Sequence, residues 1–429
     1  MKLRTCLGAV ASLLAAVLLC GCTLTGTGNV DELLRAPQLS GEYSAVQKAL
    51  NSYLGESAQL KYPQNGDFLS PFLFGDWDGD GVQDAAVLYL DSQSANVQLA
   101  VLQTDDQGKW EVSGTAEGLS DTVDSVRFAR MQGGDANQIL VGYATQGAEY
   151  LAVYSYKNHA LQAVLQQTYS QYLIEDITGS GTEDIVLLTS DEKGQTQIRI
   201  LTDGDDGFAV MQVIGLSADR FTGYAALAAG VGANGGQYLV LDGWTGASGS
   251  YLASVILAFD KATGQMSAAQ LPGTNDIYTD SLRYASVLTS RDIDGDGIVE
   301  IPVQTEEAGN LNLVQNRQMS FVRWMDYTSA VPEKHFGLLD EEYGYYLELP
   351  MEWEGNLLMT DGPDADTVVL NNLSGGELYL ELRVVSAGEL SDGWQSLATV
   401  DSRQVQVHLG ETTESTMAAR FAGAVHLLK

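Results

Sequence analysis

The residues FGDWDGDGVQDAAVLYL, at positions 74–90, place a run of acidic side chains directly before an apolar run. Oxygen donors occupy positions 1, 3, 5, 7 and 9 of this loop, the seventh position through its backbone carbonyl: Asp76, Asp78, Asp80, Val82 and Asp84. Gly79 and Gly81 allow the backbone to turn where other residues would clash. Because calcium prefers several hard oxygen ligands from a sharply turning loop, the stretch predicts a Ca2+ site that leads into a β-strand.

A second copy of the pattern, RDIDGDGIVEIPV, occupies positions 291–303. Its oxygen donors follow the same spacing, again with one backbone carbonyl: Asp292, Asp294, Asp296, Ile298 and Glu300. Carboxylates this close repel one another unless a cation lies between them. The two copies therefore predict two calcium loops.

The EF-hand begins with the same spacing but needs a glutamate at position 12 and a helix after it. Position 12 is Val87 in the first copy and Val303 in the second, and both loops continue into β-rich runs. The EF-hand interpretation fails. No nucleophile or general base is spaced beside either loop, so the predicted metal is structural and no catalytic residue is predicted.

The region from Phe72 to Met325 repeats loosely, with glycine- and aspartate-rich turns followed by short β-rich runs. The runs begin on polar residues: Asp84, Gln138, Asp184, Gln237 and Glu300. Their starts are separated by 54, 46, 53 and 63 residues. A period near 50 residues, with several strands in each period, is typical of propeller blades. The predicted fold class is mainly β, a β-propeller with five readable repeats.

The loop pattern followed by a strand resembles the FG-GAP/VCBS repeat family of β-propellers, over about residues 70–325. The resemblance implies that the oxygen donors of both loops hold calcium and that the loops join strands of a blade. A third loop, EDITGSGTEDIVLL, keeps Asp176 and Asp184 but has Thr178 and Ser180 where carboxylates belong. Whether it binds metal is left open.

The N-terminus reads as an export signal, with Lys2 and Arg4 before an apolar run that ends in Leu19-Cys20-Gly21-Cys22. This ending resembles the lipobox of bacterial lipoproteins, which implies cleavage before Cys22 and lipid attachment to its sulfur. All three cysteines lie at or before Cys22, so the mature chain would have no disulfide. The expected location is the extracytoplasmic face of the cell membrane. An ordinary secretory signal or a plain membrane anchor is the alternative.

Four segments are predicted along the chain. Residues 1–21 form the signal peptide, 22–41 a lipidated tether, 42–331 the propeller with a short helix at 43–55, and 333–429 a smaller α+β domain. The last boundary rests on a change near Pro332, after which alternating strands lack the aspartate-glycine loop.

The composition restricts the partners. A net charge of −34 repels nucleic acid, so no nucleic-acid partner is expected. Gly230, Gly232 and Gly235 match a dinucleotide pattern, but a strand-like run follows where a helix is required, so no nucleotide is expected. The sequence predicts a binding or adhesion module for a cell-surface protein or a polysaccharide, and not an enzyme. The alternative is a polysaccharide-acting enzyme with its site in the propeller channel.

Overall fold

The structure is a computed structural model that describes residues 41–429 except 132, 134, 205, 206, 218, 270–275, 285, 306–318, 365, 375, 390 and 429. The predicted signal peptide, Cys22 and nearly all of the tether lie outside the described residues. The predicted helix is confirmed as α3 (Gly41–Leu54). Val46 and Leu50, one helical turn apart, pack α3 against the first sheet.

The described strands form six antiparallel sheets that follow one another in chain order. The first has β1 (Gln59–Leu60), β2 (Phe72–Gly75), β3 (Asp84–Leu90), β4 (Gln98–Thr104) and β5 (Trp110–Glu117). The second has β6 (Thr122–Ala129), β7 (Gln138–Ala144), β8 (Glu149–Lys157) and β9 (Ala160–Tyr169). The third has β10 (Gln171–Glu175), β11 (Asp184–Ser190), β12 (Thr196–Gly204) and β13 (Gly207–Gly215).

The fourth sheet has β14 (Gly223–Val231), β15 (Gln237–Thr245), β16 (Tyr251–Asp260) and β17 (Gln265–Ala268), and α4 (Ile277–Asp280) follows it. The fifth has β18 (Ile301–Thr305), β19 (Met319–Met325), β20 (Glu333–Asp340), β21 (Tyr345–Leu349) and β27 (Val425–Leu427). The sixth has β22 (Leu357–Asp361), β23 (Thr367–Asn372), β24 (Leu378–Ser386), β26 (Arg403–Leu409) and β25 (Gln395–Val400), and α5 (Glu411–Met417) follows it in the chain.

The β-rich runs predicted from the sequence are strands β3, β7, β11, β15 and β18. Strands β7, β11 and β15 are apolar along their length because neighbouring sheets stack on both of their faces. β3, in the first sheet, packs on α3 with one face and on the second sheet with the other. In β11, for example, Ile185 and Leu187 pack on the second sheet, whereas Val186 and Leu188 pack on the fourth. Successive side chains of a strand point to opposite faces, so a strand between two sheets buries every residue.

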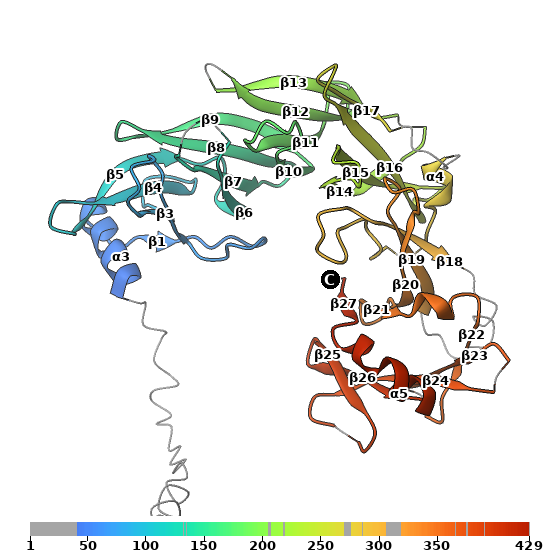
Figure 1. The fold of residues 1–429 in the computed structure, drawn as a ribbon. Coiled ribbons are helices and arrows are strands. Elements are labelled where there is room, and N and C mark those ends of the chain that lie inside the picture. Colours follow the sequence, from blue (N-terminus) through green and yellow to red (C-terminus); the bar gives the residue numbers. More distant parts are fainter. Residues whose placement is uncertain are drawn as a thin grey trace, which may run out of the picture.

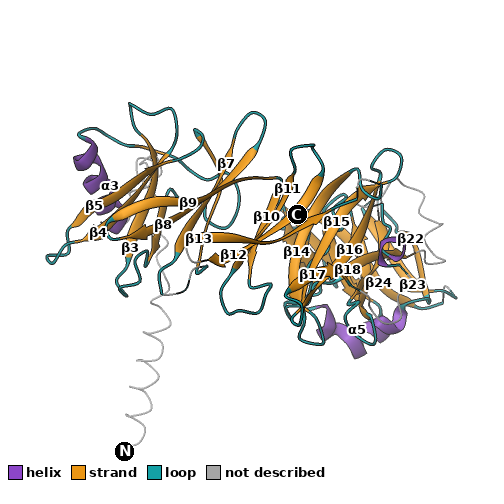
Figure 2. Cartoon of the chain, turned by 90° about the horizontal axis from the view of Figure 1, so that it is seen from above, coloured by secondary structure: helices purple, strands orange, loops and turns teal. Residues whose placement is uncertain are grey.

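The stacked sheets follow an arc (Figure 1). Buried apolar clusters join each sheet to the next along the chain. Seen from above, strands make up most of the described chain (Figure 2). Within that part of the chain, no strand of the first sheet pairs with a strand of the sixth. The architecture is mainly β and of the propeller type, with the first and sixth sheets at the two ends of the arc.

The sheet topology bears on the predicted boundary between residues 331 and 333. β19 and β20 pair from Met319↔Asp340 to Met325↔Glu333, so the fifth sheet spans this boundary. β27 then returns from near the C-terminus to pair with β21 in the same sheet. The sequence change near Pro332 marks a change in loop chemistry, not the edge of a sheet. A separately folding C-terminal domain from residue 333 stays a prediction.

Candidate metal centres

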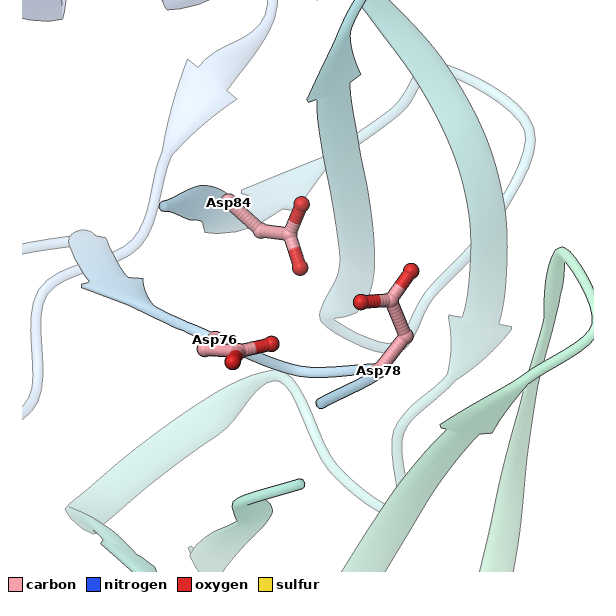
Figure 3. A group of neighbouring side chains, drawn as sticks. All are labelled: Asp76, Asp78 and Asp84. Carbon is pink, nitrogen blue, oxygen red and sulfur yellow. The ribbon is translucent and has the colours of Figure 1, made fainter. Parts of the chain in front are cut away.

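The first acidic loop connects β2 to β3. Asp76, Asp78 and Asp84 each offer a carboxylate oxygen, and these oxygens all lie within 4.8 Å of one another. Figure 3 shows the carboxylates converging from the loop and from the start of β3. Asp80 and Val82, also predicted as donors, lie on the exposed part of the loop, and Asp80 is not in the converging group. An all-oxygen set of this kind suits Ca2+.

The loop backbone is organised by Asp76. Its two carboxylate oxygens accept hydrogen bonds from the backbone N–H groups of Gly79 (2.7 Å) and Gly81 (2.9 Å). Both glycines have positive φ angles, 80° and 83°, which other residues adopt only with strain. A Cβ on Gly79 would also lie 3.0 Å from the backbone nitrogen of Ala136, so the loop packs closely against the connection between β6 and β7 in the second sheet.

Asp84 fixes the other end of the loop. It is 2% exposed, and its Oδ2 accepts a hydrogen bond from the backbone N–H of Trp77 at 3.0 Å. Three other strands have a polar residue at their first position or just before it that accepts a hydrogen bond from a backbone N–H six or seven residues upstream. These pairs are Gln138 with Met131, Asp184 with Thr178, and Glu300 with Ile293. At these four strands, the polar residue that begins the β-rich run therefore holds its loop closed.

The carboxylates of the first loop accept hydrogen bonds from a neutral side-chain amide rather than from a cationic side chain. Nε2 of Gln103, on β4, donates to Asp78 Oδ2 (2.8 Å) and to Asp84 Oδ1 (3.1 Å). Burial raises the pKa of Asp84 to about 6; the hydrogen bonds from Trp77 and Gln103 oppose the shift. Among the described residues, no lysine, arginine or histidine forms an ion pair with these carboxylates.

Gln103 also links the loop to the second sheet. Its Oε1 accepts a hydrogen bond from the Tyr156 hydroxyl (2.8 Å) and lies 3.2 Å from Ser113 Oγ. Ser113 in turn contacts Tyr156 and, at 3.1 Å, Nδ1 of His159. Sequence reasoning missed Gln103, because an amide 19 residues beyond Asp84 carries no local signal.

The second acidic loop has the same backbone and the same converging group. Oxygens of Asp292, Asp294 and Glu300 lie within 4.8 Å of one another. Asp292 accepts hydrogen bonds from the N–H groups of Gly295 (2.6 Å) and Gly297 (2.7 Å), and both glycines again have positive φ, 81° and 88°. The predicted donor Asp296 lies outside this group of side-chain carboxylates. The backbone carbonyl of Ile298 stays a predicted donor.

Unlike the first loop, the second loop faces a lysine. Nζ of Lys334, on β20, lies 2.7 Å from Glu300 Oε1, 2.7 Å from Asp296 Oδ2 and 3.1 Å from Asp294 Oδ2. Burial raises the pKa of Glu300, and its hydrogen bond with Lys334 opposes that shift. At Asp294 burial also acts upward, but hydrogen bonds from Lys334 and His335 outweigh it and lower the pKa. The second loop therefore contains its own positive charge.

The third loop keeps the backbone and loses carboxylates. Asp176 accepts hydrogen bonds from the N–H groups of Ser180 (2.9 Å) and Gly181 (2.8 Å), as Asp76 and Asp292 do in their loops. The Thr178 hydroxyl donates to Asp184 Oδ2 at 3.0 Å. Within the described residues, this loop is not among the carboxylate groups that could hold a metal.

No protein-family model matches the chain, and no curated protein matches it in sequence. Among solved structures, the chain is similar to TolB from Acinetobacter baumannii, with 14% identity, 62% of this chain and 57% of that chain covered, and a TM-score of 0.24. It is similar to the Dos1 propeller, with 10% identity, 82% and 81% covered, and a TM-score of 0.26. It is also similar to a rhamnogalacturonan lyase from Bacillus licheniformis, with 14% identity, 72% and 59% covered, and a TM-score of 0.25.

Likenesses at this level carry no argument about activity. The propeller-type architecture follows from the order and stacking of the chain's own sheets. Among the helices of the described residues, none has the length and apolar character needed to cross a lipid bilayer.

Proposed function

We propose that this protein is an extracytoplasmic lipoprotein, anchored in the cell membrane through Cys22, whose FG-GAP/VCBS-type propeller is stabilised by calcium. It acts as a binding or adhesion module for a cell-surface protein or a polysaccharide. The observation that supports the calcium site is the convergence of Asp76, Asp78 and Asp84, with oxygens within 4.8 Å of one another.

The position of the first loop supports a structural metal. Asp84 is the first residue of a buried strand, and the Asp76 carbonyl accepts a hydrogen bond from the N–H of Asn137 (3.1 Å), just before β7. The loop thus touches both the first and the second sheet. A bound ion would hold the Asp76, Asp78 and Asp84 carboxylates together and stiffen this joint, which keeps neighbouring surface loops in a fixed arrangement for a partner.

Thermal unfolding of the chain, with calcium and then with a chelator, tests the proposed site. We expect calcium to raise the melting temperature, by the equivalent of about 2.7 kcal/mol at a hundredfold excess over the dissociation constant. Asp78→Ala should abolish the shift, because it removes a converging carboxylate. Asp106→Ala, an exposed aspartate in the turn between β4 and β5, is the matched control and should keep the shift. A wild-type melting temperature indifferent to calcium would contradict the proposal.

The same variants separate binding from catalysis. If the protein is a binding module, the wild type in calcium should be retained on immobilised polysaccharide or on a cell-surface protein, and the Asp78→Ala variant should be retained less. Neither should release sugar from the polysaccharide. Calcium-dependent release of oligosaccharide would instead support the polysaccharide-acting enzyme.

A further inference from the structure

We propose that the Lys334 ammonium is the resident cation of the second loop, so that the chain takes calcium at the first loop alone. This inference deepens the proposed function and rests on it for the first loop. The Lys334 Nζ contacts carboxylates of Asp294, Asp296 and Glu300 at 2.7–3.1 Å. One ammonium does not neutralise all the carboxylates of the loop, but it occupies the position among them that a metal would take.

The backbone places Lys334 at a β-bulge. Met325 pairs with Glu333 and Trp324 pairs with His335, so Lys334 is the extra residue of β20. A bulge of this kind re-aims a side chain relative to the regular alternation of the strand. Here the re-aimed side chain reaches the acidic loop of its own sheet.

The first sheet has the same bulge at the same place. Leu102 pairs with Val112 and Val101 pairs with Gly114, so Ser113 is the extra residue of β5. In both sheets the bulge adjoins the residue that pairs with the position directly after the acid that closes the loop: Leu102 pairs with Ala85, and Met325 pairs with Ile301. Ser113 and Lys334 are thus equivalent positions, and only Lys334 can supply a charge.

The second and third sheets repeat the bulge with apolar residues. The extra residue is Val164 in β9 and Met211 in β13. Their loops have lost most of the carboxylates: the second sheet has Gln138 where the first has Asp84, and the third keeps only Asp176 and Asp184. The bulge position is thus a serine or a lysine in the two sheets with an acidic loop, and an apolar residue in the two sheets with a depleted loop.

Lysine and calcium exclude each other at the second loop. Calcium binds carboxylate oxygens at 2.3–2.6 Å, and the Lys334 Nζ already lies among the same oxygens. Displacing the ammonium would break its ion pair with Glu300, whose side chain is fully buried. Calcium can enter this group only if the ammonium leaves it, so the three ion pairs of Lys334 oppose metal binding at the second loop.

Calorimetric titration of the full chain with calcium tests the inference through the number of sites. We expect one site in the wild type, two in Lys334→Ser, and none in Ser113→Lys, because a lysine at the bulge of the first sheet reaches Asp78 and Asp84. Lys193→Ser, at an exposed lysine in the turn between β11 and β12, is the matched control and should keep one site.

A measurement on Asp294→Ala keeps the inference testable even if Lys334→Ser does not fold. We expect the Asp294→Ala variant to bind calcium at one site, as the wild type does. If the wild type bound calcium at two sites and the variant at one, the inference would be overturned. A folded Lys334→Ser chain that gains no site would overturn it as well. Failure of the proposed function looks different: Asp78→Ala would then leave the number of wild-type sites unchanged.

Discussion

The loop at 76–84 and the loop at 292–300 fold the same way and differ in the side chain that faces their carboxylates. In both, the first aspartate accepts N–H groups from two glycines with positive φ, and a buried acid closes the loop. The first loop faces the neutral amide of Gln103, and the second faces the ammonium of Lys334. One loop scaffold thus faces a neutral donor in the first sheet and a cation in the fifth.

The third loop shows what the scaffold needs. Its Asp176 accepts hydrogen bonds from the N–H groups of Ser180 and Gly181, and it has a pair of glycines at the same positions, Gly179 and Gly181, with φ of 69° and 88°. It does so with hydroxyls at Thr178 and Ser180. The backbone therefore depends on the first aspartate, the glycines and the acid that closes the loop. The cation is a separate contribution. It is either an ion from solution or a side chain from a later strand of the same sheet.

The largest expected effect is at Glu300. Glu300→Gln keeps an oxygen for the N–H of Ile293 but removes the buried charge that pairs with Lys334. We expect the free energy of unfolding to fall by about 3 kcal/mol without calcium, measured by urea denaturation in chelator. Glu192→Gln, an exposed glutamate in the β11–β12 turn, is the control and should change little. A loss no larger than the control's would mean that Lys334 does not stabilise the second loop.

A smaller effect should follow from rebuilding the third loop. Thr178→Asp combined with Ser180→Asp restores carboxylates on a backbone that already has the required turn. Met211 stands at the bulge there, so the position that Lys334 occupies in the fifth sheet carries no charge in the third. We expect calcium to stabilise this variant by about 2 kcal/mol more than the wild type at about thirtyfold excess over the dissociation constant.

The matched control for the rebuilt loop is the same double variant in chelator. Without calcium, the added carboxylates repel Asp176 and Asp184, so this variant should unfold more easily than the wild type. If calcium gives it no extra stability, the backbone turn and the carboxylates are not sufficient for binding, and the comparison between the first two loops would need another determinant.

Local features of the sequence predicted the scaffold well. The glycines, the spacing of the aspartates and the polar residue before each apolar run lie within one loop, so the strand starts at Asp84, Gln138 and Asp184 agree with the structure. Helix α3 could also be predicted from a local pattern, since its buried residues Val46 and Leu50 are one helical turn apart. What the sequence did not distinguish is which donors converge: Asp80 and Asp296 fit the spacing but lie outside the groups.

The side chain facing each loop could not be predicted from spacing. Gln103 comes from the next strand, and Lys334 from the strand after that, 34 residues beyond Glu300. Whether such a residue reaches the loop depends on strand register and on a bulge of one residue, and a shift of one residue reverses the face of a side chain. The pairing of β19 with β20 across the predicted boundary near Pro332 could not be predicted for the same reason, because it is also set by register.

The smallest expected effect has the opposite sign from that at Glu300. Asp84→Asn keeps an oxygen for the Trp77 N–H, loses the oxygen that accepts from Gln103, and removes one of the converging negative charges of the first loop. Gln138 makes the same contact in the second sheet without a charge. Because no described lysine pairs with Asp84, we expect a gain of about 1 kcal/mol in chelator and loss of the calcium-induced stabilisation.

Urea denaturation of Asp84→Asn, with calcium and with chelator, checks both signs on one variant. Asp121→Asn, at an exposed aspartate just before β6, controls for the change of charge alone. If neutralising Asp84 destabilised the chain in chelator as Glu300→Gln is expected to do, a positive group of the chain would have to balance the first loop as well. The difference between the loops would then lie in something other than the serine or lysine at the bulge. A gain in chelator together with a loss in calcium requires that the first loop depend on an ion from outside the chain, whereas the second does not.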